Sequence, residues 1–458
     1  TFKPLRQLYL LLALLFSVFF TFGQQQKTLI KNVNLWDGTS KKLQEGMDLL
    51  ITDNLITEIA KNIVEAKADL IIDGNGKTMI PGLIDAHVHL ASTMSSSKIR
   101  NDMDWMYTAM RAAKSAENFL MLGFTTVRDL GGPSFGIKKA VDEDLYPGPR
   151  IYPSGAYISQ TSGHGDGRNP NEPSTHWSGG PMHPSDAMGW SFVVDGVSEV
   201  LKASRENLRK GATQLKVMAG GGIDSKFDPI HSIQFTVAEM EAAVQAAADW
   251  DTYVAVHIYN AKGAIRALNA GVKCLDHGHL INEEVIKLLK EKDAWLVPQT
   301  FWTTAPPDFW APGLGTIPPE LDLKIKPVLA GTVNAMNLAK KYAVNIGFGS
   351  DAYGNLGFEK LALTEFTART QWFTPIEILK QATSENAKLL GLSGQTNPYR
   401  EGKLGVIEVG SYADLLIYQG NPLKNLDVIV KPKENLKLIM KDGKLFKNEL
   451  SFSTNSNN

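Results

Sequence analysis

Eight apolar runs of strand length recur between residues 79 and 350, and stretches with helical spacing follow most of them. This alternation favours a parallel sheet, because each helix carries the chain back to begin the next strand in the same direction. Eight such units over about 320 residues suit a (β/α)8 TIM barrel, and a doubly wound sheet is the alternative. The expected strands cover 79–89, 125–129, 150–158, 214–219, 253–258, 274–277, 295–299 and 345–350.

The two ends of the chain have a different pattern. Between 28 and 73, and again after 413, short β-like runs are separated by Asn and Asp-Gly turns, and 428–430 is one of these runs. Neither end alone has enough strands to bury a core. We therefore expect residues 24–80 and 402–450 to form one small composite β-sandwich domain beside a barrel over 81–401.

The N-terminal residues have the order of a secretory signal peptide. Lys3 and Arg6 precede an apolar run over 8–22, and small residues up to Gly23 precede three glutamines. The run is shorter than the ~20 residues that span a bilayer comfortably, which favours a cleaved signal over a membrane anchor. We expect a signal peptide over 1–23, a periplasmic or secreted protein, and no stable membrane insertion after cleavage.

The charge and cysteine content exclude some functions. The formal net charge is -1, and no stripe of basic residues interleaved with aromatics is present, so nucleic acid is not an expected partner. The single cysteine, Cys274, excludes an intramolecular disulfide, and its apolar surroundings predict a buried structural thiol. Arg128 and Asp129, at the end of the second expected strand, are interpreted as a structural ion pair.

The run from Pro81 to His89 carries the strongest chemical signal. Residues i and i+2 of a strand point to the same face, so His87 and His89 project together at the end of an apolar strand. Two imidazoles placed in this way can chelate one metal ion. A lone His-x-His is weak evidence, and its position at a strand end is what raises its value.

Four further strands place a potential ligand near their carboxyl ends: Lys216, His257, His277 and Asp351. Each has an ordinary interpretation by itself, as a solvated lysine, a hydrogen-bonded core histidine or a helix-capping aspartate. In a barrel, however, catalytic groups come from the carboxyl ends of several strands. Their joint order along the chain therefore favours a metal site.

This order resembles the amidohydrolase superfamily, and specifically its imidazolonepropionase-like branch, which includes Xaa-Pro-type dipeptidases. The resemblance covers nearly the whole chain after the signal, including 73–85 and the closing run 402–415. It implies a binuclear metal centre and a flanking composite β-domain. It also implies these ligands: His87, His89 and Asp351 on the more buried metal, a carboxylated Lys216 bridging both metals, and His257 and His277 on the second.

The chemistry of such a site is self-consistent. Burial lowers the pKa of a lysine, and the neutral amine of Lys216 can react with CO2 to give a carbamate with two anionic oxygens. Two divalent ions, with zinc the default and manganese, iron or cobalt the alternatives, turn a bridging water into hydroxide and polarise the substrate carbonyl. Asp351 is the expected catalytic residue, which accepts the proton of the attacking hydroxide and delivers it to the leaving amine.

Two residues are expected to bind substrate. His164, in the run 162–166, matches a motif of this branch, and Tyr259 matches a tyrosine that contacts a substrate carboxylate. Long loops over 159–190 and 300–320 follow the third and seventh strands, and structured loops of this length usually carry function. The aromatic residues of the second loop, which would cover the substrate, are Phe301, Trp302, Phe309 and Trp310.

The expected activity is hydrolysis of a carbon–nitrogen bond in a linear amide, a dipeptide or N-acyl amino acid, by a possible homo-oligomer. A cyclic-amide hydrolase or a non-catalytic binding relative is the alternative. A deaminase is disfavoured, because those relatives place a glutamate just after the histidine that matches His257, whereas Ile258 follows here. A non-catalytic relative would lack ligands, and none is missing.

Overall fold

The computed structural model describes residues 25–95, 97–99, 104–223, 225, 227–305 and 317–454. The expected signal peptide over 1–23 lies outside the described residues, as do Phe309 and Trp310. Among the helices that the structure does describe, none is long and apolar enough to cross a membrane.

Strands occur at all eight expected positions, and together with an unexpected short strand over 191–193 they form two parallel sheets. The expected strand over 79–89 is divided, because 78–81 belongs to a different sheet. The first sheet has the order β6 (Leu83–Val88), β7 (Phe124–Asp129) and β8 (Arg150–Pro153). The expected strand over 150–158 is split, and its second part is β9 in the other sheet. That sheet has the order β10 (Ser191–Val193), β9 (Tyr157–Ser159), β11 (Leu215–Met218), β12 (Val254–Asn260), β13 (Cys274–Leu280), β14 (Trp295–Val297) and β15 (Asn345–Ile346).

Backbone contacts link the two sheets at both edges. The Ala86 amide of β6 donates to the Phe348 carbonyl just after β15, at 2.9 Å, and Val88 forms a parallel bridge with Ala352. At the other edge, the Thr213 amide donates to the Pro153 carbonyl at 2.9 Å. The strands thus follow one another around a common interior as two arcs of parallel sheet, not as one continuous ladder.

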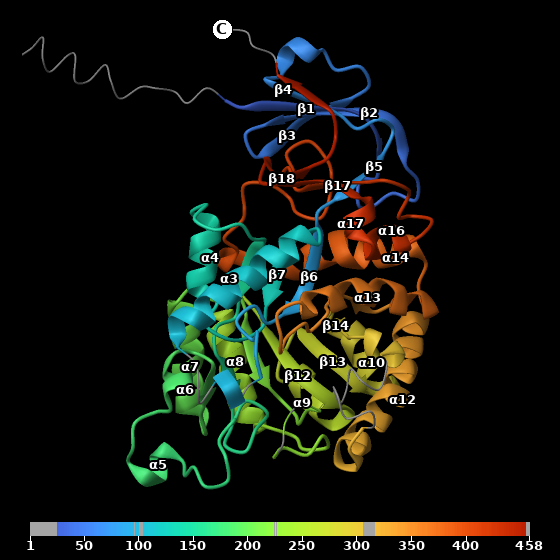
Figure 1. The fold of residues 1–458 in the computed structure, drawn as a ribbon. Coiled ribbons are helices and arrows are strands. Elements are labelled where there is room, and N and C mark those ends of the chain that lie inside the picture. The colour runs from blue at the N-terminus through green and yellow to red at the C-terminus, as the bar shows by residue number, and fades with distance from the viewer. Residues whose placement is uncertain are drawn as a thin grey trace, which may run out of the picture.

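Helices cover the outside of these strands (Figure 1). Two large apolar clusters fill the space between helices and strands, one around Phe124 and Phe348 and the other around Val256 and Leu275. Side-chain caps begin several helices directly after a strand or loop; Asn260, for example, accepts from the Gly263 amide. The main helices are α3 (Trp105–Met121), α4 (Phe135–Asp142), α7 (Val197–Arg209), α8 (Val237–Ala248), α9 (Ala261–Asn269), α10 (Glu283–Glu291), α12 (Pro319–Tyr342), α13 (Leu361–Ala368), α14 (Pro375–Lys380) and α15 (Asn386–Gly391).

Both ends of the chain contribute to a third sheet, at the top of Figure 1. Its main path is β18 (Lys444–Asn448), β17 (Leu436–Lys441), β16 (Leu415–Tyr418), β5 (Thr78–Pro81), β1 (Lys27–Leu35), β2 (Gln44–Thr52) and β3 (Leu55–Ala60). Two more strands extend from β1: β4 (Leu70–Asp73) pairs with it, and β19 (Phe452–Thr454) pairs with β4.

Two expectations about these ends need correction. The expected sandwich is a single hydrogen-bonded sheet of nine strands, which encloses its own apolar core around Ile30, Leu49 and Leu438. The expected strand over 428–430 is instead the short helix α16 (Asp427–Val430). An apolar run this short fits either structure, and here only Ile429 needs burial, against the cluster that also contains Phe366 of α13.

Candidate metal centre

Three of the predicted ligands meet where β6 and the segment after β15 end. His87 is almost fully buried, and its Nε2 lies 3.3 Å from Asp351 Oδ1. The Nε2 of His89 lies 3.1 Å from the same oxygen. The Asp351 amide also donates to the His87 carbonyl at 2.7 Å, which fixes the aspartate against β6. The structure therefore brings together the three residues that the resemblance assigns to one metal.

The other three predicted ligands come from β11, β12 and β13. The His257 and His277 rings lie 4.4 Å apart between centroids, and His277 lies 5.0 Å from the His87 ring. Lys216 is buried, with its Nζ 2.5 Å from Asp276 Oδ2. One ligand atom from each of His87, His277 and Asp351 lies within 4.8 Å of the others. All six predicted ligands therefore face one region at the strand ends.

Two of these residues have strained backbones. His277 and Asp351 adopt positive φ angles of 72° and 53°. Side chains with a β-carbon rarely adopt this conformation, which costs on the order of 1–3 kcal/mol and tends to occur at functional sites. The left-handed backbone at both positions sets the direction in which these two side chains enter the cluster.

Burial keeps three histidines of the cluster, His87, His257 and His277, neutral. It lowers the pKa of His87 to about 4, although the Asp351 carboxylate acts in the opposite direction. Burial also lowers the pKa values of His257 and His277 well below their ordinary value, and neighbouring histidines and Lys216 add to the effect. Neutral imidazole is the form that binds metal.

The pKa values of the carboxylate ligand Asp351 and the amine ligand Lys216 are also shifted. Burial would raise the pKa of Asp351, but the nearby His87 and His89 lower it below its ordinary value, so the carboxylate is ionised. Burial lowers the pKa of Lys216 even though Asp276 opposes the shift. The cluster therefore presents the neutral imidazoles of His87, His257 and His277 and the charged oxygen of Asp351 at neutral pH, as a divalent ion requires.

The expected ion pair between Arg128 and Asp129 is wrong. Neighbouring residues of a strand point to opposite faces, and Arg128 instead reaches Asp276, whose Oδ1 lies 2.9 Å from its Nη2. Asp129 accepts from the Leu90 amide and the Ser134 hydroxyl. Cys274 is buried beside Arg128, as expected for a structural thiol.

Gln299, at the end of the β14 segment, was not predicted. It is fully buried, and its Oε1 lies 2.8 Å from His277 Nδ1. An amide oxygen only accepts, so the hydrogen stays on Nδ1 and the lone pair of His277 is left on Nε2. The sequence signal was present but weak: a polar residue two positions after the buried Val297.

The model of the Amidohydrolase family matches residues 78–446. This chain belongs to that family. It is thus a hydrolase of the group that cleaves amide bonds, and its similarities place it in the branch that contains Xaa-Pro-type dipeptidases.

Three relatives illustrate the similarity of this amidohydrolase. It is 31% identical to an ochratoxinase of Aspergillus niger over 382 residues, which are 81% of this chain and 75% of the relative. A solved prolidase complexed with N-methylphosphonate-L-proline is 32% identical, with a TM-score of 0.83 over 93% of this chain and 100% of the other. A solved Xaa-Pro dipeptidase with bound methionine in its active site is 29% identical, with a TM-score of 0.77 over 92% and 100%.

The two predicted substrate residues of this amidohydrolase stand beside the cluster. The His164 ring stacks on His257 with 4.0 Å between centroids and 11° between planes. Its Nδ1 lies 3.1 Å from Asp228 Oδ2. The Tyr259 ring stacks on His277 at 5.1 Å. Both predicted residues therefore contact imidazoles of the second predicted metal position.

The glycine run after β11 lets His164 approach. A β-carbon at Gly222 would lie 2.2 Å from a carbon of the His164 ring. Lys324 of α12 donates to the carbonyls of Gly222, Ser225 and Asp228, at 3.0, 2.7 and 3.2 Å, so a charged side chain holds this loop. The close approach that these glycines allow is thus made by a side chain of the protein itself.

Aromatic residues after β14 line the same side. Phe301 and Trp302 lie in a short 3-10 helix and are buried with Tyr259, Ile223 and Ile325. The Trp302 ring lies 6.3 Å from that of His277. The described part of the expected aromatic loop is therefore ordered against the cluster, and it forms an apolar wall.

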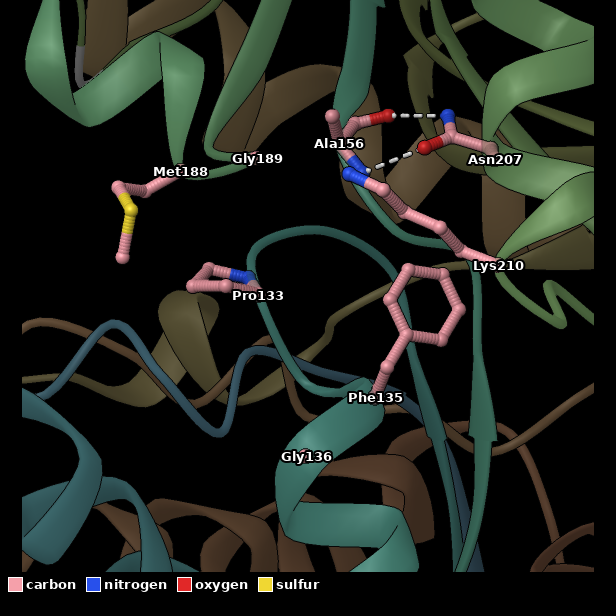
Figure 2. Close-up of a pocket in the computed structure, with 8 residues that line it drawn as sticks. All are labelled: Pro133, Phe135, Gly136, Ala156, Met188, Gly189, Asn207 and Lys210. Carbon is pink, nitrogen blue, oxygen red and sulfur yellow. Dashed lines mark hydrogen bonds between the residues drawn. The ribbon is translucent and has the colours of Figure 1, made fainter.

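A separate pocket of about 250 Å³ lies away from this cluster (Figure 2). Pro133, Phe135, Met188 and Lys210 line it, and no predicted site residue does. Asn207 and Ala156 also line it, and Asn207 exchanges two hydrogen bonds with the Ala156 backbone, at 2.9 and 3.1 Å. The asparagine thereby satisfies the backbone at the break between β8 and β9.

Proposed function

We propose that this chain is an exported, binuclear metal hydrolase that cleaves the amide bond of dipeptides or N-acyl amino acids. The observation that carries the proposal is the convergence of six buried ligand residues at the strand ends: His87, His89, Lys216, His257, His277 and Asp351. The apolar segment over 8–22 supports the export, and the place of action is then the periplasm or the medium.

The chain's own residues fit divalent metal ions. Among the buried polar atoms of the described residues, His87 Nε2 and His257 Nε2 have no hydrogen-bond partner. A buried polar atom left in this state costs free energy unless something else binds it. Imidazoles with carboxylate and carbamate oxygens suit zinc first. When bound, the ions supply an acidified water and a polarised substrate carbonyl.

The amine of Lys216 is the site for the CO2-derived carbamate. Its burial favours the neutral amine that CO2 needs. A carbamate would give this position the negative charge and the second oxygen that a lysine lacks. The Lys216 side chain then contributes to both metal positions.

Asp351 is the residue that moves the proton. Its carboxylate is ionised and held between His87 and His89. It accepts the proton from the attacking water and delivers it to the nitrogen of the leaving amine, so the amine departs as a neutral group. The same Asp351 carboxylate therefore takes part in both proton transfers.

The substrate class follows from the residues around the cluster. His164 and Tyr259 offer polar hydrogens to an anionic group, and Phe301 and Trp302 offer an apolar surface. This combination suits an amide with a free carboxylate on the leaving side. The names of the relatives, a prolidase and a Xaa-Pro dipeptidase, support amino-acid products.

The test is a metal analysis followed by a library assay. We expect close to two metal ions for each chain by elemental analysis, and release of free amino acids from a library of dipeptides and N-acyl amino acids. One ion at full activity with an unmodified Lys216 would contradict the binuclear site. Hydrolysis of cyclic amides alone would contradict the proposed substrate class.

A further inference from the structure

Asp276 lies at the centre of a buried charge network that the proposed function does not use. It stands on β13 directly before His277 and is fully buried. Its Oδ2 lies 2.5 Å from Lys216 Nζ, and its Oδ1 lies 3.4 Å from His87 Nδ1. One carboxylate thus contacts two predicted metal ligands that come from different strands.

Arg128 holds the Asp276 carboxylate in place. Its Nη2 donates to Asp276 Oδ1 at 2.9 Å, its Nε to the Ala86 carbonyl at 2.5 Å and its Nη1 to the Tyr253 hydroxyl at 3.0 Å. The guanidinium is fully buried, so it has no room to swing away. Arg128 thus contacts β6, the residue directly before β12, and β13. These contacts fix the guanidinium, which is the rigid donor that holds the Asp276 side chain.

The contact with His87 selects the useful tautomer. When Nδ1 carries the hydrogen and faces Asp276, the lone pair lies on Nε2, which is buried without a hydrogen bond. Gln299 Nε2 lies 3.4 Å from the same Nδ1 and carries two hydrogens, one of which donates to the Val297 carbonyl at 3.2 Å. The Asp276 carboxylate lies equally close to Nδ1, at 3.4 Å, and a hydrogen bond to a charged carboxylate is stronger than one between neutral groups, so it favours the hydrogen on Nδ1. Metal-binding histidines commonly donate their other N–H to a carboxylate, which fixes the ring direction.

We propose that Asp276, anchored by Arg128, is the positioning residue that directs both Lys216 Nζ and His87 Nε2 toward the metal centre. This inference rests on the proposed function, because it concerns the same six-ligand site. In this proposal Asp276 does not bind a metal. Its single carboxylate sets the direction of two ligands, Lys216 and His87, which come from different strands.

The role of Asp276 toward Lys216 continues after the lysine is modified. The lone pair of neutral Nζ forms a bond to the carbon of CO2, one C–O π pair moves onto oxygen, and one proton leaves to solvent. The product has one N–H left, and this hydrogen still donates to Asp276 Oδ2. The anionic carbamate oxygens are repelled by the Asp276 carboxylate, so they point away from it.

A purely structural role for Asp276, as the counter-ion of buried Arg128, makes a different prediction. Removing the charge of Asp276 would then act only by leaving Arg128 unpaired, and removing both charges together would restore the site. The two roles are therefore separated by Asp276→Asn and by the double variant Arg128→Gln with Asp276→Asn. Asp414→Asn is a matched control, because Asp414 is a buried partner of another buried arginine, Arg150.

The measurements use the full chain loaded with zinc and 13C-bicarbonate. Zinc content is read by elemental analysis at a fixed free-zinc concentration, and the carbamate is read from its 13C resonance. For Asp276→Asn and for the double variant we expect zinc affinity to fall ten- to a hundred-fold and the carbamate resonance to disappear. Asp414→Asn should keep both at the wild-type level.

Two results would overturn the inference. One is an Asp276→Asn protein that keeps two zinc ions and its carbamate resonance. The other is recovery of both in the double variant, which also serves if the single variant fails to fold. A wild-type protein that binds two zinc ions and CO2 but cleaves no dipeptide would refute the proposed substrate and leave the role of Asp276 standing.

Discussion

The site of this amidohydrolase is built from two kinds of element that differ in how they hold a side chain. The strand-end residues, such as His87 and His257, are buried and lie in or next to parallel ladders. The loop residue His164 is part-buried, and side chains of other loops hold it, chiefly Asp228. The first group is fixed by the fold, whereas the second depends on contacts that can change without altering the strands of the two parallel sheets.

This difference separates two tasks. A metal centre needs several ligands held within a few tenths of an ångström, which strands provide. Recognition of the substrate needs groups that vary from one relative to another, which loops provide. We therefore expect changes at strand ends to remove catalysis or metal, and changes on the loop side to alter substrate preference while the metal stays bound.

The largest effect is expected at a strand end, for Asp351→Asn. The amide cannot accept the proton at neutral pH and is a weaker ligand, so kcat should fall by about 10³-fold or more, at the upper end of what a general base contributes. The fold should persist, because Asn keeps the shape, and circular dichroism and the Tm report this. Activity within a few-fold of wild type would assign the proton transfer to another residue.

The strand-end group was the part that the sequence made predictable. Residues such as His87 and Lys216 follow apolar runs, and the rule that catalytic groups cluster at the carboxyl ends of barrel strands brings them together before any coordinates are known. Strands occur at all eight expected positions, although the first is divided between β5 and β6 and the third between β8 and β9, and the short strand β10 was not expected. Strand periodicity and strand-end position carry this information.

The partners of these residues were less predictable. Asp276 contacts Lys216 and Arg128 across the interior, 60 and 148 positions away in the chain. Such pairs depend on side-chain reach between strands, which local patterns do not encode, and Arg128 was therefore paired with its neighbour Asp129. The loop contact between His164 and Asp228 was missed for the same reason, since 64 residues separate them.

A second prediction uses the burial of the strand-end histidines. Burial lowers the pKa of His87 to about 4 and that of His279 to about 3, below the ordinary 6.5. The unfolded chain therefore binds protons that the folded chain does not, and the folded state loses stability as the pH falls from about 6.5 toward 4 and 3. For His87 alone the loss is about 3 kcal/mol.

The measurement is the free energy of unfolding of the metal-free protein between pH 7 and 4. His279→Gln should reduce the slope, because it removes one buried imidazole while its amide can still bond to Thr332, the partner of His279. His176→Gln is the matched control on the loop side, since His176 is exposed on the short helix α5 (Thr175–Ser178). Equal slopes in the wild type and His279→Gln would show that the buried histidines do not control acid stability.

The smallest effects are expected for the two predicted substrate residues, His164 on a loop and Tyr259 near the end of β12, which lie beside the second predicted metal position. Each is proposed to donate a hydrogen bond to the substrate carboxylate, and charge-assisted bonds of this kind contribute roughly 1.5–3 kcal/mol. Tyr259→Phe keeps the ring that stacks on His277 and removes only the hydroxyl. We expect kcat/KM for a dipeptide to fall about ten- to a hundred-fold, with zinc content unchanged.

The decisive comparison pairs each dipeptide with its C-terminal amide. The wild-type enzyme should strongly prefer the free carboxylate, and Tyr259→Phe should lose most of that preference, because the missing hydroxyl affects the acid and hardly affects the amide. Wild type and Tyr259→Phe, each assayed with the dipeptide and with its amide, form a double-mutant cycle. The cycle measures the contact between the Tyr259 hydroxyl and the substrate carboxylate, because the general effect of the substitution cancels. Equal hydrolysis of acid and amide by the wild type would remove the carboxylate contact from the proposal and make a neutral or cyclic amide the better substrate. Loss of zinc in Tyr259→Phe would instead place the tyrosine with the strand-end group, because its effect would then act through His277 and not through the substrate.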